Sequence, residues 1–200
     1  MSEESMFVLD SSTKESTPSK FLIIDKEDDF IQEGVIIKSL EVDPEEEKYF
    51  QITAEKEGQL MQTQRQWFPE KERAASEESY KKSVSIKKGL LASLLRKFQG
   101  GDANIQASSW PDFVRKIDEA CKAHYADTPL RVKLELVENK GKYYTNISTF
   151  APFESLTIPT SESQMKITAK DKQMLRNKIE EERITPDTDT STSSQDDSPF

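Results

Sequence analysis

The sequence predicts a mainly β domain in which two helices separate the third strand from the fourth, followed by a polar tail. Three observations lead to this prediction. Segments of alternating, often β-branched apolar residues occur before residue 69 and again after residue 129. Between them, residues 83–125 repeat their apolar residues at helical spacing. A hydrophobic content of 34% is low for a 200-residue chain folded from end to end.

These observations divide the chain into four parts. A flexible N-terminal arm is expected at residues 1–20, because this segment is polar and rich in Ser, Thr and Glu. The folded body spans 21–158, and a linker with a short helix spans 159–184. Residues 185–200 have the composition of a disordered acidic tail.

Three strands are expected in the first half of the body, at residues 34–42, 47–54 and 59–68. Asp43-Pro44 ends the first strand, and the second places Phe50 and Ile52 on one face. The third strand is unusual because glutamines share a face with Leu60 and Phe68, so neither face is a plain core face.

Two helices are expected next. Ser83 is a suitable N-cap for the first helix, which carries an apolar stripe and ends before Gly100-Gly101. Ser109 is expected to cap the second helix, with Pro111 in its first turn. The inward side of the second helix should carry Phe113, Ile117, Cys121 and either His124 or Tyr125.

Two more strands complete the body, at residues 131–137 and 142–148, and Asn139-Lys140-Gly141 turns one into the other. A five-stranded Greek-key barrel with its helix between the third and fourth strands is the oligonucleotide-binding (OB) fold. The element order therefore predicts an OB-fold barrel. Two helices in place of one leave another α+β arrangement open.

A further helix is expected at residues 168–184, where Thr168 begins a variant capping box. Met174, Leu175 and Ile179 form its only apolar side, which is too small for firm docking. A mobile helix, a self-association element that would make a homo-oligomer, and an extension of the tail all remain open.

The charge is distributed unevenly. The formal net charge is −9. Residues 1–64 hold six Lys/Arg and sixteen Asp/Glu, residues 65–148 hold sixteen and eleven, and residues 149–200 hold six and ten. A basic middle between acidic ends is the asymmetry expected if a nucleic-acid surface lies in the body. The alternative is a solvated surface of uneven charge.

Single-stranded DNA is bound without sequence preference by cations that neutralise its backbone and by aromatic rings on which bases stack. The candidate DNA contacts, where strand alternation directs side chains outward, are Lys48, Tyr49, Arg65, Trp67, Arg131, Lys133, Lys140, Lys142, Tyr143 and Tyr144. Arg65 and Trp67 are the leading pair because they share a strand face. Only one of the two adjacent tyrosines can face outward. For each aromatic residue the alternative is ordinary packing.

No catalytic or metal site is expected. The alternative is a metal-dependent nuclease, in which Mg²⁺ would have to be held by the acidic cluster Asp25, Asp28, Asp29 and Glu33. No glycine-rich phosphate loop or partner motif accompanies this cluster. The single Cys121 and single His124 cannot form a disulfide or a Cys/His zinc cluster, and we interpret both as packing residues. The prediction is a protein that is not an enzyme and needs no cofactor.

The chain ends with Gln195-Asp196-Asp197-Ser198-Pro199-Phe200, an apolar ring on an acidic, serine- and threonine-rich segment. This tip resembles that of bacterial and bacteriophage single-stranded DNA-binding proteins, whose tails end Asp-Asp-x-Pro-Phe or close to it. The match covers about six residues, and no other family motif is matched residue by residue.

The resemblance implies a protein that coats and protects single-stranded DNA during replication, recombination and repair. It further implies that the tip residues Asp196, Asp197, Pro199 and Phe200 recruit partner enzymes, and that the tail can lie in the protein's own DNA groove. The alternative is a protein-interaction adaptor whose acidic ends mimic DNA, without DNA affinity.

No apolar run approaches the ~20 residues of a membrane span, and Met1-Ser2-Glu3-Glu4 is acidic where a secretory signal would be basic. The expected location is the cytoplasm, that of the host if a phage encodes the protein, without a membrane partner.

Overall fold

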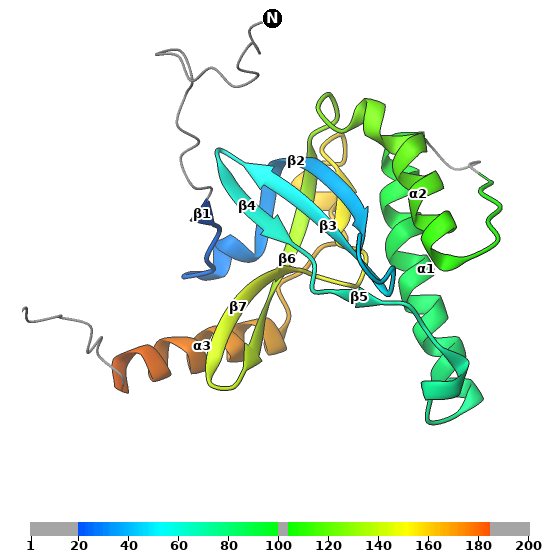
Figure 1. Cartoon of the computed structure of the whole chain (residues 1–200). Helices are drawn as coiled ribbons and strands as arrows, with labels where there is room; N and C mark the ends of the chain where they lie inside the picture. Colours follow the sequence, from blue (N-terminus) through cyan, green and yellow to red (C-terminus); the bar gives the residue numbers. More distant parts are fainter. Residues whose placement is uncertain (1–19, 100–103, 185–200) are drawn as a thin grey trace, which may run out of the picture.

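Eight strands and three α-helices make up the described part of the chain, residues 20–99 and 104–184 of a computed structural model (Figure 1). The strands are β1 Lys20–Phe21, β2 Ile31–Val42, β3 Tyr49–Lys56, β4 Gln59–Gln62, β5 Gln66–Trp67, β6 Leu130–Asn139, β7 Lys142–Ile147 and β8 Phe153–Ser155. The helices are α1 Glu77–Gln99, α2 Trp110–Cys121 and α3 Ala169–Ile184. The predicted arm at 1–20, apart from β1, and the predicted tail at 185–200 lie outside the described residues, as does the Gly100-Gly101 helix end.

Five of the strands form a nearly closed antiparallel barrel in the order β4-β3-β2-β6-β7. The two ends of this row meet where Thr63, just after β4, forms a parallel bridge with Ile147 at the end of β7. Three short strands extend the sheet: β1 runs parallel to β4, β5 pairs with β3, and β8 pairs with β6. The mainly β class predicted from the element order is confirmed at this level.

The core follows the predicted alternation. Phe50, Ile52 and Ala54 of β3 are fully buried, and the apolar side chains of β6 lie in the same core. Helix α1 contributes Leu91 and Leu94 to this core, and α1 and α2 lie together on one side of the barrel (Figure 1). The apolar face of each strand thus determines which side of the sheet is left outward.

The predicted third strand is broken in two. Between β4 and β5 the chain is held by Thr63, whose Oγ1 accepts a hydrogen bond from the Ile52 amide at 3.1 Å. Gln66 is 2% exposed, and its side chain accepts a hydrogen bond from Lys87 Nζ at 2.6 Å. Of the glutamines in this segment, Gln66 is thus the one that fills a buried polar position, and its hydrogen bond connects α1 to β5.

Helix α1 begins earlier than predicted. Ser76 Oγ accepts a hydrogen bond from the Ser79 amide at 3.1 Å, so the helix starts six residues before the predicted cap. The charged turn from Glu77 carries no apolar stripe, which is why sequence periodicity misses it.

Helix α2 starts as predicted. Ser109 Oγ accepts a hydrogen bond from the Asp112 amide at 3.3 Å, which confirms its role as the N-cap. Ile117 and Cys121 are buried, and of the two candidates after them it is Tyr125 that faces inward. His124 is exposed, so its interpretation as a packing residue is wrong.

The predicted hairpin is confirmed. β6 and β7 pair from Leu134 with Ile147 to Asn139 with Lys142. Lys140 and Gly141 form the turn with φ angles of 54° and 74°, the left-handed conformation that tight hairpins need.

Helix α3 docks on the barrel, so the expectation that its apolar side is too small to dock is wrong. Leu175 is buried, Met174 and Ile179 pack partly buried against the core, and polar contacts add to these. Lys178 Nζ donates to Asp25 Oδ1 at 2.6 Å and to the Ile24 carbonyl at 2.8 Å. At the other end of the helix, Thr168 Oγ1 accepts a hydrogen bond from the Asp171 amide at 3.2 Å and Asp171 Oδ2 accepts one from the Thr168 amide at 2.7 Å, the two bonds of the predicted capping box.

Within residues 20–99 and 104–184, none of the helices combines the length and the apolar character needed to cross a bilayer.

Candidate functional site

Two aromatic rings and a guanidinium meet on the outer face of β3 and β5. Tyr49 and Trp67 are paired across these strands, with ring centroids 5.2 Å apart at an interplanar angle of 57°. Arg65 places its guanidinium carbon 5.0 Å from the Tyr49 centroid, which is cation–π distance. Trp67 remains 51% exposed. Three of the predicted site residues are therefore neighbours, which we name the Tyr49–Arg65–Trp67 cluster.

Arg65 reaches this cluster in a way that strand alternation does not predict. It lies in the break between β4 and β5, so it does not share a continuous strand with Trp67. The Tyr49 ring lies against both residues instead.

Lys48 precedes the cluster in the loop between β2 and β3. Its side chain is 43% exposed and forms an ion pair with Glu46 at 2.7 Å. The carbonyl of Lys48 accepts a hydrogen bond from the Phe68 amide at 2.8 Å, which holds this loop beside β5. An anion approaching Lys48 would compete with Glu46 for the ammonium group.

The hairpin separates its two tyrosines. Tyr144 is 48% exposed, next to the exposed Lys140 and Lys142. Tyr143 is half-buried, and its hydroxyl donates to Glu181 of α3 at 3.2 Å. Partial burial, followed by the Glu181 carboxylate, raises the pKa of Tyr143. Tyr144 is thus the tyrosine that faces outward, and Tyr143 joins the hairpin to α3.

The expectation that Arg131 faces outward is wrong. Its side chain is 3% exposed, forms one ion pair with Glu154, and forms another with Glu33 at 2.8 Å. The hydrogen bond with Glu154 is the largest cause of a raised pKa at Arg131. The guanidinium is enclosed because Glu33 of β2 and Glu154 of β8 lie on either side of it in the sheet, while the Ile158 carbonyl and Thr160 Oγ1 each accept a hydrogen bond from it at 3.2 Å.

Lys133, two residues further along β6, is also engaged within the protein. Its Nζ donates to Asp171 Oδ2 at 3.0 Å and to the Lys166 carbonyl at 2.9 Å, with 15% of the side chain exposed. Lys133 therefore anchors the start of α3 and, like Arg131, lies apart from the Tyr49–Arg65–Trp67 cluster.

Two exposed apolar residues were missed by the sequence analysis. Phe21 and Ile23 are 56% and 60% exposed. The segment that carries them follows β4 and then reaches β7, since the Leu22 amide donates to the Leu60 carbonyl at 2.9 Å and the Ile24 amide donates to Thr145 Oγ1 at 3.1 Å. The alternation of Phe21 and Ile23 with the buried Leu22 and Ile24 was the available signal.

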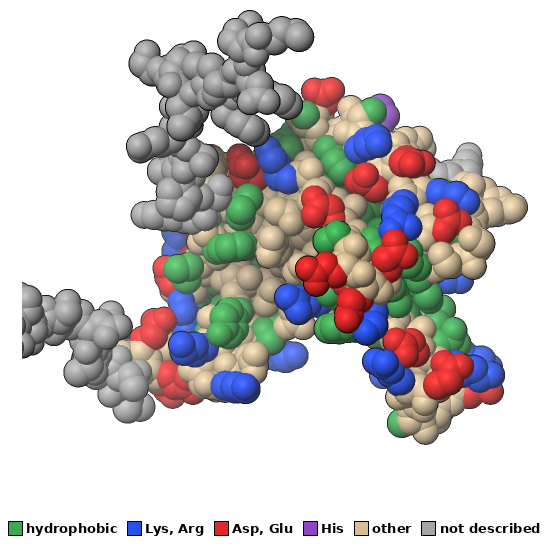
Figure 2. Space-filling model, viewed as in Figure 1, with side chains coloured by type: hydrophobic (Ala, Val, Ile, Leu, Met, Phe, Trp, Pro, Cys, Tyr) green, Lys and Arg blue, Asp and Glu red, His purple; other side chains and the backbone are tan. Residues whose placement is uncertain are grey.

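Between these aromatic groups the outer face of β3 and β4 carries uncharged polar side chains. Gln51 Nε2 donates to the Thr63 carbonyl at 3.1 Å, and Gln62 Nε2 donates to Thr53 Oγ1 at 3.3 Å. Figure 2 shows mostly uncharged side chains over β3 and β4, with hydrophobic groups and Lys and Arg at the β6–β7 hairpin. Two acids border these groups, since Glu55 follows on the outward face of β3, where it pairs with Lys38 at 3.4 Å, and Glu41 of β2 lies opposite Gln51.

Three of the four acidic residues considered for Mg²⁺, namely Asp25, Asp29 and Glu33, have other partners. Asp29 accepts hydrogen bonds from the amides of Asp25 and Lys26 at 3.0 and 3.1 Å, and Asp25 pairs with Lys178. Glu33 pairs with Arg131. In the described part of the chain, no group of three or more His, Cys, Asp or Glu is placed to hold a metal ion.

Cys121 is buried as predicted, and burial, with the nearby Asp118 carboxylate, raises the pKa of its thiol to about 12. Such a thiol is not ionised at neutral pH and does not act as a nucleophile.

Comparison of the sequence with protein-family models gives no match, and comparison with curated proteins gives none either. The functional interpretation therefore depends on the residues and their geometry.

Proposed function

We propose that this protein binds single-stranded DNA without strong sequence preference, on the outer face of β3, β5 and the β6–β7 hairpin. The observation that carries the proposal is the Tyr49–Arg65–Trp67 cluster, in which a guanidinium lies on one ring beside a second, exposed ring. Such a group offers a cation to a phosphate and an aromatic plane to a base, the combination that binding of single strands requires.

The strand order supports an OB-type barrel. With β2, β3, β4, β6 and β7 taken as strands one to five, α1 and α2 fall between strands three and four. OB folds bind oligonucleotides on strands two and three and on the loops that join strands one to two and four to five. These correspond here to β3, β4, residues 43–48 and residues 140–141.

The candidate contacts lie on that surface. Tyr49 begins β3, Lys48 belongs to the first of the two loops, and Lys140 belongs to the second. Tyr144 follows the second loop on an outward position. We infer that a single strand runs between the Tyr49–Arg65–Trp67 cluster and the hairpin, past the uncharged polar side chains of Gln51 and Gln62 on β3 and β4.

Affinity for oligo-dT should fall steeply as salt concentration rises, because bound phosphates release counterions. With Lys48, Arg65, Lys140 and Lys142 each neutralising one phosphate, the slope of log affinity against log salt should be about −3, at about −0.7 per contact on single strands. Fluorescence anisotropy with labelled oligo-dT measures this slope.

A duplex of equal length is the control for that titration. Equal affinity for the duplex at moderate salt would contradict the single-strand proposal. If neither DNA binds, the results favour the alternative function, a protein-interaction adaptor whose acidic ends mimic DNA. Cleavage of the DNA on addition of Mg²⁺ would favour the alternative of a metal-dependent nuclease.

We also propose, from the resemblance, that the segment with Asp196, Asp197, Pro199 and Phe200 recruits replication or recombination enzymes. This segment lies outside the described residues. Deleting residues 198–200 should abolish enzyme recruitment in a pull-down, while oligo-dT affinity stays unchanged or rises slightly because an acidic competitor is weakened. Deleting residues 191–193 removes the same number of residues and should preserve recruitment. Loss of DNA affinity on deleting 198–200 would contradict this role.

A further inference from the structure

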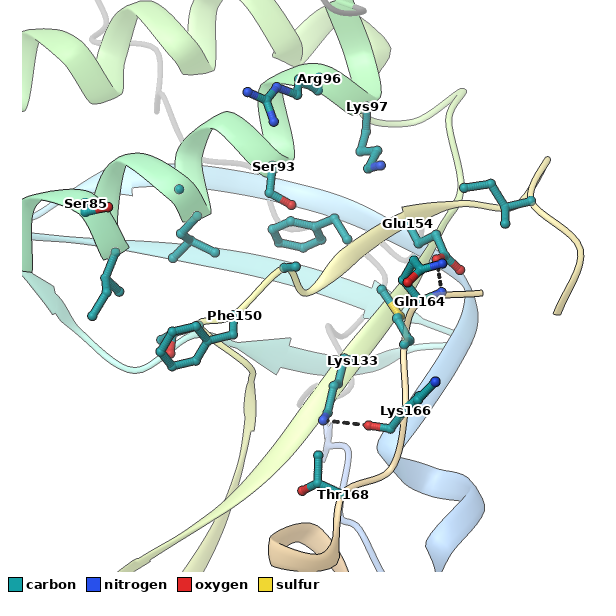
Figure 3. A pocket seen from close by; sticks show the side chains of 18 residues that line it. Ser85, Ser93, Arg96, Lys97, Lys133, Phe150, Glu154, Gln164, Lys166 and Thr168 are labelled. Carbon is teal, nitrogen blue, oxygen red and sulfur yellow. Dashed lines mark hydrogen bonds between the residues drawn. The ribbon is translucent and has the colours of Figure 1, made fainter. Parts of the chain in front are cut away.

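A cleft of about 750 Å³ lies between α1 and residues 149–168, apart from the Tyr49–Arg65–Trp67 cluster (Figure 3). One wall is α1, which presents the small side chains of Ser85 and Ser93. The opposite wall is the segment that carries Lys166 and Thr168, and Phe150 stands at one end. A cleft of this size is within the range that holds a bound ligand.

The cleft is cationic. Its lining contains Arg96, Lys97, Lys133 and Lys166 but a single acid, Glu154. Glu154 is already satisfied, since one oxygen pairs with Arg131 and the other accepts a hydrogen bond from the Gln164 amide at 3.0 Å.

Three of these cations have no acidic partner in residues 20–99 and 104–184. Among the described residues, none forms an ion pair with Arg96, Lys97 or the Lys166 ammonium group. Figure 3 shows Lys97 directed from α1 toward the opposite wall. An unpaired cationic lining favours an anion that extends along the cleft.

An exposed aromatic ring accompanies the cations. Phe150 is 68% exposed, the most exposed of the large hydrophobic side chains described. It directly precedes Ala151, which has a φ of 41°, a conformation that non-glycine residues rarely adopt. A free aromatic face beside unpaired cations repeats the chemistry of the Tyr49–Arg65–Trp67 cluster.

Both surfaces border helix α1. A pocket beside Trp67 is bordered by Ser83 and Lys87, and the cleft is bordered by Ser85 and Ile86 of the same helical turn. The hydrogen bond from Lys87 to Gln66 fixes this turn against β5.

We propose that single-stranded DNA continues from the barrel face along α1 into this cleft, where Arg96, Lys97 and Lys166 bind phosphates and Phe150 stacks on a base. This inference rests on the proposed function and extends the site to a second face. It predicts that long strands use contacts that short strands cannot reach.

The test compares oligo-dT of about 5 and about 16 nucleotides, the two ends of the range covered by one OB fold. The triple change Arg96→Ala, Lys97→Ala and Lys166→Ala should lower the affinity for the long oligonucleotide at least about tenfold. It should also reduce the slope of log affinity against log salt by about 2. Phe150→Ala should lower the affinity for the long oligonucleotide at least about fivefold, the lower limit for the loss of one base–aromatic stack. Neither change should affect the short oligonucleotide.

The matched control removes one arginine and two lysines from exposed positions that do not line the cleft: Lys116→Ala, Lys122→Ala and Arg176→Ala. It changes the net charge equally and should leave the long-strand affinity nearly unchanged. An equal effect of the cleft and control variants would overturn the proposal, because net charge alone would then explain the loss.

The remaining outcomes are distinct. If the cleft variants bind oligonucleotides of both lengths with the affinity of the native protein, the proposed extension of the site into the cleft is wrong, while the proposed site on the barrel is unaffected. If the native protein binds neither length, the proposed function fails and this inference with it. If the triple variant keeps long-strand affinity but loses binding of a synthetic Asp-Asp-Ser-Pro-Phe peptide, the cleft is an acidic-peptide site and the proposal is wrong.

Discussion

Replacing Trp67 and Tyr144 together by alanine is expected to weaken oligo-dT binding at least about 30-fold. Each base–aromatic stack contributes about 1–3 kcal/mol, so the loss of two costs at least about 2 kcal/mol. Both rings are about half exposed, at 51% and 48%, so their removal should leave the unfolding midpoint close to that of the native protein. Fluorescence anisotropy and thermal unfolding followed by circular dichroism measure the two quantities.

Trp67→Phe and Tyr144→Phe are the matched controls, because they keep an aromatic face and should retain most of the affinity. The chain has two tryptophans, and Trp110 is packed between Phe68 and Phe113. In a Trp110→Phe background, Trp67 fluorescence should be quenched when a base stacks on the indole. Native affinity in the double alanine variant, with no quenching, would mean that DNA does not stack on this face.

Glu154→Ala is expected to lower the free energy of unfolding by about 3 kcal/mol, near the lower end for removing one partner of a buried ion pair. The variant leaves the buried Arg131 guanidinium with Glu33 as its remaining carboxylate. Urea denaturation measures the change. Glu162→Ala, an exposed acid on the same covering segment, should change the stability little.

The same substitution tests the role of Arg131. Under conditions where the protein stays folded, Glu154→Ala should leave oligo-dT affinity unchanged, because Arg131 and Glu154 are both buried and lie apart from the Tyr49–Arg65–Trp67 cluster. A loss of affinity without a loss of stability would instead place Arg131 in DNA binding.

The stability that this ion pair gives should depend on pH. Burial would raise the pKa of Glu154, but hydrogen bonds from Ser163, Arg131 and the Gln164 amide outweigh it and lower the pKa below its ordinary value of 4.5. The contribution is therefore complete above pH 4.5 and is lost as pH falls through the lower pKa of the folded state. The Glu154→Ala variant should accordingly lose less stability than the native protein between neutral and acidic pH.

Sequence periodicity predicted the elements whose apolar residues repeat regularly. The alternation of Phe50 with Ile52, and the turn at Gly141, were enough to place a buried strand and a hairpin correctly. Helix α1 was predicted too short because its first turns, from Glu77, are held by a serine cap and charged residues rather than by an apolar stripe.

The exposure of a candidate site residue was predictable only where it depends on the alternation of that residue's own strand. Trp67 is exposed because its neighbour Gln66 points into the core. Arg131 also alternates with core residues, yet it is buried by Glu154, Ile158 and Thr160, which lie 23 to 29 residues further along the chain. Which outward positions a later segment covers depends on tertiary packing, and one strand's pattern holds no information about it.

Helix α3 has a consequence for where the domain can be shortened. Its Lys178 side chain donates hydrogen bonds to the Ile24 carbonyl and to Asp25. These two residues end the segment that bonds to β4 on one side and to β7 on the other. Cutting after Ile158 would therefore do more than remove an appendage. It would remove the contacts that hold the segment between β4 and β7 in place next to Phe21, on the side where the proposed strand of DNA passes.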